Sequence, residues 1–180
     1  MAQNRMIWIY KEDRLWEMPS MTDALELKHG CPVISAAGAG GKTTTLHRLA
    51  EEFVRQGQRV IVTTTTHIIE EDEPCFLRAV PEGGAPAALP QMQADAQAFS
   101  DLVRDRLDRF GQVWTGMPAY GGKLGSLPAL FLEQLWDLEI PVLTEADGAR
   151  RMPLKVPAAH EPVIHPRTTH VLSVYGLDAV

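Results

Sequence analysis

The apolar positions of this chain follow two alternating patterns, short continuous runs and segments with helical spacing. The run VIVTT at 60–64 is β-branched throughout, which predicts a strand buried on both faces of a sheet. Between 42 and 56 the apolar residues recur three and four positions apart and Gly57 follows them, which predicts an amphipathic helix. Together with the apolar run that starts at Val33, these segments predict a right-handed strand–helix–strand unit.

The same two patterns predict the remaining elements. Two short apolar pieces around a polar turn at 6–18 favour a hairpin, and Ser20 or Thr22 can cap a short helix that continues through Lys28. Further helices are expected at 92–110 and 127–138. Further strands are expected at 75–80, 112–115, 141–144 and 169–178. The stretch PEGGAPAALP at 81–90 has the composition of a linker.

Composition and charge narrow the possible classes of function. The 180 residues suit a single domain, 1–180, in which 1–30 form an N-terminal extension. Acidic residues number 23 against 17 basic ones, and a net charge of -6 argues against binding to nucleic acid or to an anionic membrane. No apolar run could cross a bilayer and the N-terminus lacks the apolar core of a signal peptide, so we predict a cytoplasmic protein. Cys31 and Cys75 match no metal or redox spacing and are expected to be reduced.

The strongest indication of chemistry is the segment VISAAGAGGKTTT at 33–45. An apolar run, a loop of small residues and Lys-Thr-Thr at a helix start follow the order that a phosphate-binding loop requires. Lys42 would reach the β- and γ-phosphates, and the hydroxyl of Thr43 would bind Mg²⁺. The predicted nucleotide-binding residues are Gly38, Ala39, Gly40, Gly41, Lys42, Thr43 and Thr44. The usual first glycine of the motif is Ala36 here, and the alternative is a glycine-rich turn that binds nothing.

This loop and the order of the elements favour one fold class. We predict an α/β, P-loop NTPase-like three-layer fold with a mainly parallel sheet. Open sheets of this kind bind ligands at the carboxyl ends of their strands, and the strand at 60–64 is followed there by further threonines and His67. Thr65 and His67 are therefore candidates for contacts with a substrate. The strand-forming propensity of threonine explains the same run without any ligand.

A second candidate centre follows the apolar run at 141–144. Glu145 and Asp147 arrive at its carboxyl end, and residues two apart on a strand share a face. We predict that Lys42, Glu145 and Asp147 are catalytic, and that Thr43, Glu145 and Asp147 hold Mg²⁺. The alternative is an ordinary polar turn after a strand.

Basic residues near these two centres are candidates for binding a substrate. Arg150 and Lys155 follow the two carboxylates and could bind an anionic substrate or form surface salt bridges. Lys123 stands in GGKLG, which has no hydroxyl residue after the lysine and no firm strand in front, so we do not expect a second phosphate loop. Lys123 could close over bound phosphate or lie in a surface loop. His160, beside Glu161, is a candidate for binding or acid–base work.

Five segments in this order resemble the YqeC family, whose members are described as accessory proteins of selenium-dependent molybdenum hydroxylases. They are VISAAGAGGKTTT, VIVTTTTHI, GGKLG, LTEADGARRMPLKVPAAHEPVI and VLSVYGLD. The resemblance implies a cytoplasmic nucleotide-binding protein that assists maturation of such a hydroxylase, with that enzyme or its maturation proteins as partners. It also implies a longer natural chain, in agreement with an uncovered core strand at 169–178. The loop by itself is similar to that of the Mur ligases, which lack the same first glycine.

Three functions remain open at this point. The first is a Mg²⁺-dependent hydrolase or phosphotransferase acting on ATP or GTP. The second is a nucleotide-gated assembly factor with little turnover. The third is a Mur-like, ATP-dependent ligase that activates a carboxylate. A motif such as N-K-x-D, which would choose the base of the nucleotide, does not occur in the sequence.

Overall fold

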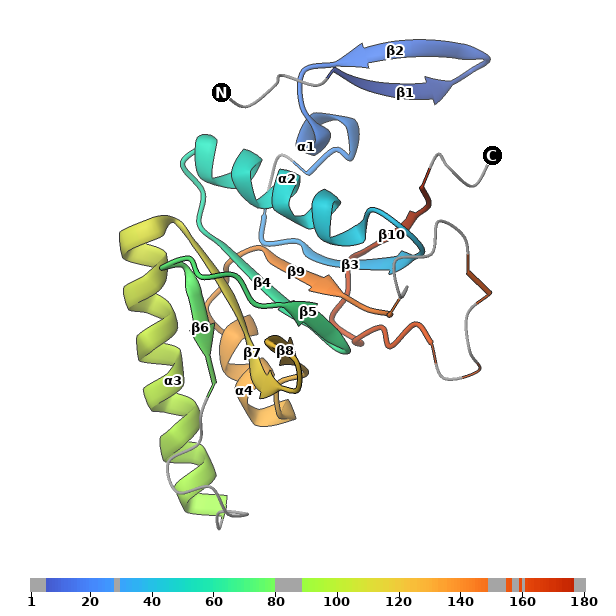
Figure 1. Ribbon diagram of the computed structural model, residues 1–180. Helices are drawn as coiled ribbons and strands as arrows, with labels where there is room; N and C mark the ends of the chain where they lie inside the picture. The colour runs from blue at the N-terminus through green and yellow to red at the C-terminus, as the bar shows by residue number, and fades with distance from the viewer. Residues whose placement is uncertain are drawn as a thin grey trace.

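The computed structural model describes residues 6–27, 30–79, 89–148, 155–156, 159 and 161–176. Within them, the chain is built around an eight-stranded sheet with the order β10-β3-β9-β4-β7-β8-β5, while β6 pairs with β7 (Figure 1). The strands are β3 (Val33–Gly38), β4 (Val60–Thr64), β5 (His67–Ile69), β6 (Phe76–Arg78), β7 (Gln112–Ala119), β8 (Lys123–Gly125), β9 (Val142–Glu145) and β10 (His170–Val174). The predicted mixed α/β class with a mainly parallel sheet is confirmed, because β10, β3, β9, β4, β7 and β6 pair in parallel.

One face of the sheet is covered by α2 (Lys42–Arg55), next to which lies the short α1 (Met21–Ala24) (Figure 1). Every second strand residue points to this face, and Ile34, Val62 and Leu143 pack there with the apolar side of α2. The amphipathic helix predicted for 42–56 is therefore confirmed within one residue.

The opposite face is covered by α3 (Leu89–Phe110) and α4 (Ala129–Trp136). The strand neighbours Val33, Ile61 and Val142 point to this side, so each central strand contributes apolar side chains to both layers. Helices on both faces explain why the central strands are apolar without alternation in the sequence.

The N-terminal residues form a separate two-stranded sheet of β1 (Ile7–Lys11) and β2 (Arg14–Met18), as the pattern at 6–18 predicts. The helix after it is shorter than expected. Ser20 caps α1 by accepting from the Asp23 N–H at 2.9 Å, but Glu26 has φ of +57°, a left-handed conformation that a continuing helix excludes.

Several boundaries differ from the sequence prediction. β7 extends to Ala119 instead of ending at 115, and α3 begins at Leu89 inside the expected linker, whose other residues are mostly outside the described part of the chain. β10 is the edge strand of the sheet and its side chains are exposed or half-buried, so it is not the buried core strand expected at 169–178. Cys31 and Cys75 are free thiols, as predicted.

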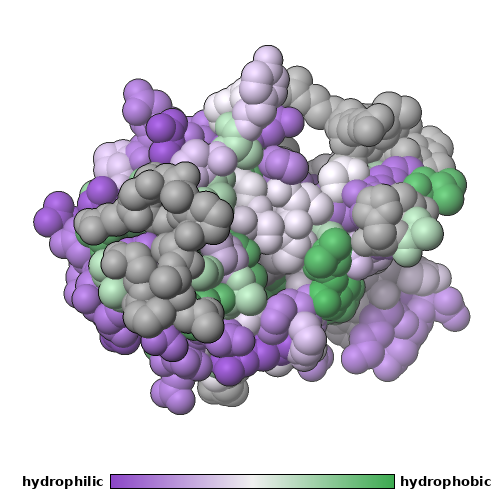
Figure 2. All heavy atoms as spheres, turned by 90° about the horizontal axis from the view of Figure 1, so that it is seen from below, coloured by the Kyte–Doolittle hydropathy of each residue, from purple (hydrophilic) through white to green (hydrophobic). Residues whose placement is uncertain are grey.

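One face of the molecule carries mostly hydrophilic residues (Figure 2). Viewed from below, hydrophilic residues predominate around much of the margin, and strongly hydrophobic atoms form small separate patches, some near the middle and one at the right-hand edge (Figure 2). In the part of the chain that the structure describes, no helix combines the length and apolar character needed to cross a membrane.

Candidate functional site

The loop between β3 and α2 depends on two glycines in left-handed conformations. Gly38 has φ of +109° and Gly41 has φ of +99°. A Cβ atom on Gly38 would lie 2.3 Å from the carbonyl oxygen of Val174, so the close approach of β10 requires glycine at this position. The sequence at 38–41 therefore folds into a tight turn that delivers the chain from the sheet edge into α2.

The amino end of α2 is open. Gly41 is its N-cap residue, no side chain in the described part of the chain caps the helix, and the first helical hydrogen bond joins the Thr45 N–H to the Gly41 carbonyl at 2.8 Å. The N–H groups of Lys42, Thr43 and Thr44 therefore have no partner within the helix. These groups and the helix dipole place partial positive charge at the loop, which suits an anion.

Ala36 stands where the phosphate-loop motif usually has its first glycine. Ala36 lies inside β3, is fully buried and pairs with Glu145 of β9 in the parallel ladder. The tight turn begins two residues later at Gly38, so the loop needs no left-handed residue at position 36.

Lys42 lies beneath the loop, buried to 2% exposure. Its ammonium donates to the carbonyl oxygens of Gly38 and Ala39 at 2.8 and 2.9 Å and lies 2.8 Å from Oδ1 of Asp147. The other oxygen of Asp147 accepts from the Gly38 N–H at 2.8 Å. The loop is thus closed around its own lysine and fixed to the segment that follows β9.

Glu145 ends β9 and reaches the start of α2. The hydroxyl of Thr43 donates to its Oε2 at 2.8 Å. Burial raises the pKa of Glu145 above its ordinary value, the Asp147 charge acts in the same direction, and the Thr43 hydrogen bond and Lys42 charge offset only part of the effect. Glu145 is consequently a buried carboxyl group that holds its proton more tightly than an exposed one.

The two predicted metal carboxylates lie in different surroundings. Glu145 lines the cleft described below, whereas Asp147 is fully buried and both of its oxygens contact the loop or Lys42. A shared metal role for the pair stays a prediction. The described residues contain no group of three or more histidine, cysteine, aspartate or glutamate side chains placed to hold a metal.

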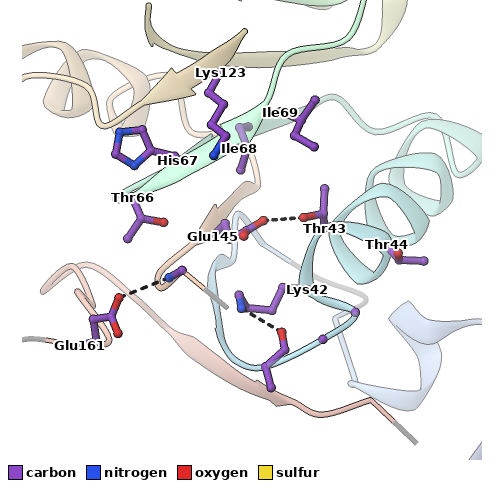
Figure 3. Close-up of a pocket in the computed structure, with 14 residues that line it drawn as sticks. Lys42, Thr43, Thr44, Thr66, His67, Ile68, Ile69, Lys123, Glu145 and Glu161 are labelled. Atoms are coloured by element: carbon purple, nitrogen blue, oxygen red, sulfur yellow. Dashed lines mark hydrogen bonds between the residues drawn. The ribbon is translucent and has the colours of Figure 1, made fainter. Parts of the chain in front are cut away.

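A cleft of about 730 Å³ opens in front of the loop. In Figure 3, Lys42, Thr43 and Thr44 form one wall, while His67, Ile69 and Lys123 come from the facing strands β5 and β8. The lining residues are Ala39, Gly40, Gly41, Lys42, Thr43, Thr44, Thr66, His67, Ile68, Ile69, Lys123, Glu145, Gly148 and Glu161. The predicted loop residues and Glu145 therefore meet at one concave site.

The GGKLG segment forms the turn of a hairpin. Gly121 and Gly122 have φ of +74° and +67° in the turn after β7, and Lys123 begins the antiparallel strand β8. The expectation that no firm strand precedes this segment is wrong, because β7 continues to Ala119. A strand and not a helix follows the glycines, so this segment lacks the helix start of a phosphate loop, and Lys123 lines the cleft.

Of the other residues predicted to bind a substrate, some line the cleft and others do not. His67 lines the cleft from β5, whereas Thr65 donates to the Val163 carbonyl at 3.0 Å and joins the end of β4 to a distant segment. Lys155 binds Glu161 at 2.5 Å and the Gly148 carbonyl at 2.6 Å at the edge of the cleft. Arg150 and His160 lie outside the described residues.

Sequence reasoning did not assign Thr66, Ile68, Ile69 or Gly148 to the site. The signal for the isoleucines was present, because HII follows the threonines and its middle residue is buried while both neighbours are exposed. That alternation is typical of a half-buried strand, but three residues are too few to identify one with the pattern alone.

The protein is of the mixed α/β class: it has a mainly parallel sheet and a glycine-rich loop that encloses a buried lysine. The chain belongs to the YqeC family: the model for that family, described as YqeC protein, matches residues 34–180. The chain is similar to the protein of Escherichia coli (strain K12) described as uncharacterized protein YqeC, with 36% identity over 144 residues, which is 80% of this chain and 51% of that protein. It therefore spans about half the length of this relative. No solved structure matches the chain.

Proposed function

We propose that this protein binds ATP or GTP with Mg²⁺ and hydrolyses the nucleotide or transfers its terminal phosphate, as a P-loop protein does. The observation that carries the proposal is the tight turn at 38–41, closed around Lys42 at the open end of α2 and hydrogen-bonded through Thr43 to Glu145.

The donors at the loop fit phosphate oxygens. Lys42, Thr43 and Thr44, whose N–H groups have no partner within the helix, line the cleft, and the ammonium of Lys42 binds two carbonyls of the loop. A phosphate in the cleft would compete with the carbonyls of Gly38 and Ala39 for the protons of Lys42. Asp147 acts through the loop in this proposal, because it holds the Gly38 N–H and Lys42 in place.

The oxygens beside the loop fit Mg²⁺, which is usually held in nucleotide sites by one or two carboxylates together with phosphate and water. The hydroxyl of Thr43 and the carboxylate of Glu145, which lie 2.8 Å apart, would hold the ion. When bound, the ion would neutralise charge on the phosphates.

Membership of the YqeC family extends the proposal to a biological role. The resemblance of this chain's motifs to that family leads us to propose action in the cytoplasm in the maturation of a selenium-dependent molybdenum hydroxylase, with that enzyme or its maturation proteins as partners. The activity and partners of the whole protein are part of the proposal, since the chain spans about half of its relative.

One observation favours nucleotide-gated binding as a second candidate function. Of the two carboxylates that line the cleft among the described residues, Glu145 accepts from Thr43 and Glu161 is bound by Lys155, so each already has a partner within the protein. This function predicts partner binding that differs between ATP, ADP and no nucleotide, with slow turnover. A Mur-like ligase would instead release ADP only when a carboxylate and an amine are both supplied.

Calorimetric titration with Mg-ATP and Mg-GTP tests the proposal. We expect Lys42→Ala to weaken nucleotide binding by about 100-fold or more, because a charge-assisted contact with phosphate is lost. Lys11→Ala, in the exposed strand β1, is the matched control and should bind as the parent chain does.

Because Lys42 is buried, circular dichroism must show that its variant is folded. Thr43→Val gives an independent measurement, since it should weaken binding of Mg-ATP much more than binding of ATP without Mg²⁺. Unchanged nucleotide affinity in both variants, or no binding by the parent chain, would reject the proposed function.

A further inference from the structure

The wall of the cleft opposite the phosphate loop is a ribbon formed by β8 and β5, which we call the ribbon wall (residues 67–69 and 123–125). Its side chains alternate. Ile68 and Leu124 are buried at 2% and 0% exposure in the core beneath α2. Their neighbours Ile69 and Lys123 pair with each other across the strands and line the cleft. One face of the ribbon wall therefore anchors it, and the other presents a lysine beside an isoleucine.

Close backbone contacts hold the ribbon wall in position. A Cβ atom on Gly116 of β7 would lie 2.4 Å from the carbonyl oxygen of Gly125, so β8 approaches β7 more closely than any side chain would allow. The Gly122 carbonyl also accepts from the Glu70 N–H at 3.0 Å. The backbone at Lys123 is thus tied to its neighbours on both sides, while the long side chain remains exposed.

The three lysines that line or border the cleft differ in their partners. Lys42 contacts Asp147 and two loop carbonyls, and Lys155 contacts Glu161 and the Gly148 carbonyl. Among the described residues, the ammonium of Lys123 has neither a hydrogen-bond nor an ion-pair partner. Figure 3 shows its side chain extending from β8 toward the Thr43–Glu145 pair.

We propose that Lys123 is the second cationic contact of this site and binds an oxyanion that lies between the ribbon wall and the phosphate loop. This inference rests on the proposed function, because Mg²⁺ at Thr43 and Glu145 would repel Lys123 unless an anion lay between them. The oxyanion is either the terminal phosphate of the nucleotide or a carboxylate or phosphate of a second, small substrate. Ile69, 52% exposed beside Lys123, would contact the less polar part of such a ligand.

The variants Lys123→Met and Lys123→Arg test this proposal in the full chain. Methionine removes the charge at nearly constant length and arginine retains the charge, while Lys11→Met serves as the control for loss of an exposed lysine. Calorimetry compares binding of Mg-ATP with binding of Mg-ADP. A second titration measures binding of inorganic phosphate, and then of succinate, to the complex with Mg-ADP.

If the terminal phosphate is the ligand, Lys123→Met should weaken the binding of Mg-ATP about tenfold and leave the binding of Mg-ADP unchanged. If a second substrate is the ligand, Mg-ATP and Mg-ADP should bind unchanged, and phosphate or succinate should bind the Mg-ADP complex about tenfold more weakly. Lys123→Arg should restore most of either loss.

Equally weakened binding of Mg-ATP and Mg-ADP would overturn the inference, because the lost contact would then involve a part of the nucleotide that ATP and ADP share. A second result would overturn it too. In that case Lys123→Met binds both nucleotides as the parent chain does, and phosphate and succinate either do not bind the Mg-ADP complex or bind it equally well in both proteins. In both cases normal nucleotide binding by the parent chain would leave the proposed function intact. A parent chain that binds no nucleotide would instead reject the proposed function itself.

Discussion

The carboxylate of Asp147 lies 2.8 Å from the ammonium of Lys42, and both side chains are almost completely buried. The same carboxylate accepts a hydrogen bond from the N–H of Gly38, at the other end of the loop. Asp147 therefore connects the segment after β9 with both ends of the turn between β3 and α2. These contacts within the protein fix the conformation of the loop.

The first prediction concerns this ion pair. Asp147→Asn should lower the free energy of unfolding by about 3 kcal/mol, because it leaves the buried charge of Lys42 without its counter-charge. Urea denaturation measures the change. Asp137→Asn, which removes an exposed carboxylate 3.4 Å from Arg167, should change the stability by less than about 1 kcal/mol. Equal effects of the two substitutions would contradict a structural role for the buried pair.

The second prediction concerns Glu145, whose pKa is raised by burial. A raised folded-state pKa means that the stabilising contribution of this group is complete below the ordinary glutamate pKa and is lost as pH rises through the folded-state pKa. Glu145→Gln, which stays neutral, should therefore be more stable than the parent chain at about pH 7, and this advantage should shrink toward about pH 4. Urea denaturation across that range measures it, with the exposed Glu17→Gln as control. A difference that does not vary with pH would argue against the raised pKa.

The third prediction concerns the glycine at the end of β3. Gly38→Ala combines a left-handed backbone with a Cβ atom 2.3 Å from the Val174 carbonyl, so it should displace β10 and cost about 3 kcal/mol of stability. Gly57→Ala separates the two effects, since Gly57 also has positive φ but has no atom within 4 Å of the added Cβ. That control should cost about 1 kcal/mol. Thermal unfolding of both variants provides the comparison, and a smaller loss at position 38 than at 57 would refute the close contact.

The fourth prediction concerns the link between α1 and α2. Burial alone would raise the pKa of Glu52, but hydrogen bonds from Arg48 and from the backbone of Thr22 and Met21 outweigh burial, and the pKa is lowered. A lowered folded-state pKa gives stability that is present above the ordinary glutamate pKa and lost as pH falls through the folded-state pKa.

Glu52→Gln should therefore destabilise the protein by about 2 kcal/mol at about pH 7 and by less as the solution is acidified. Denaturation by urea at several pH values records this trend. Glu51→Gln, an exposed neighbour in the same helix, should have little effect at any pH. The trend with pH is opposite in sign to that expected for Glu145, so a shared trend would show that one of the two assignments is wrong.

Most of the fold could be predicted from local patterns. The helix at 42–56 and the strand at 60–64 were predicted within one residue, because long helical periodicity and β-branched runs are local properties of the chain. The short elements were less predictable. β8 and β5 contain three residues each, and they form only because β7 provides an edge with which β8 can pair.

The candidate site was predictable in part. Glycines before a lysine and a threonine identified the loop, and the acidic end of a strand identified Glu145, because each motif is continuous in the sequence. The different positions of Glu145 and Asp147 were not predictable. The rule that alternate residues share a face holds within a strand, and β9 ends at Glu145, so it no longer applies at Asp147.

The sequence by itself determined the central strand–loop–helix unit, the mainly parallel sheet and the family. Tertiary structure alone decided which distant groups meet. Because β9 lies between β3 and β4, Glu145 reaches Thr43 and Asp147 reaches Lys42 over more than one hundred positions of sequence. Lys123 faces the loop because a hairpin carries it across the cleft. Local patterns set the conformation of each segment, whereas the pairing of strands and the burial of charge set these contacts.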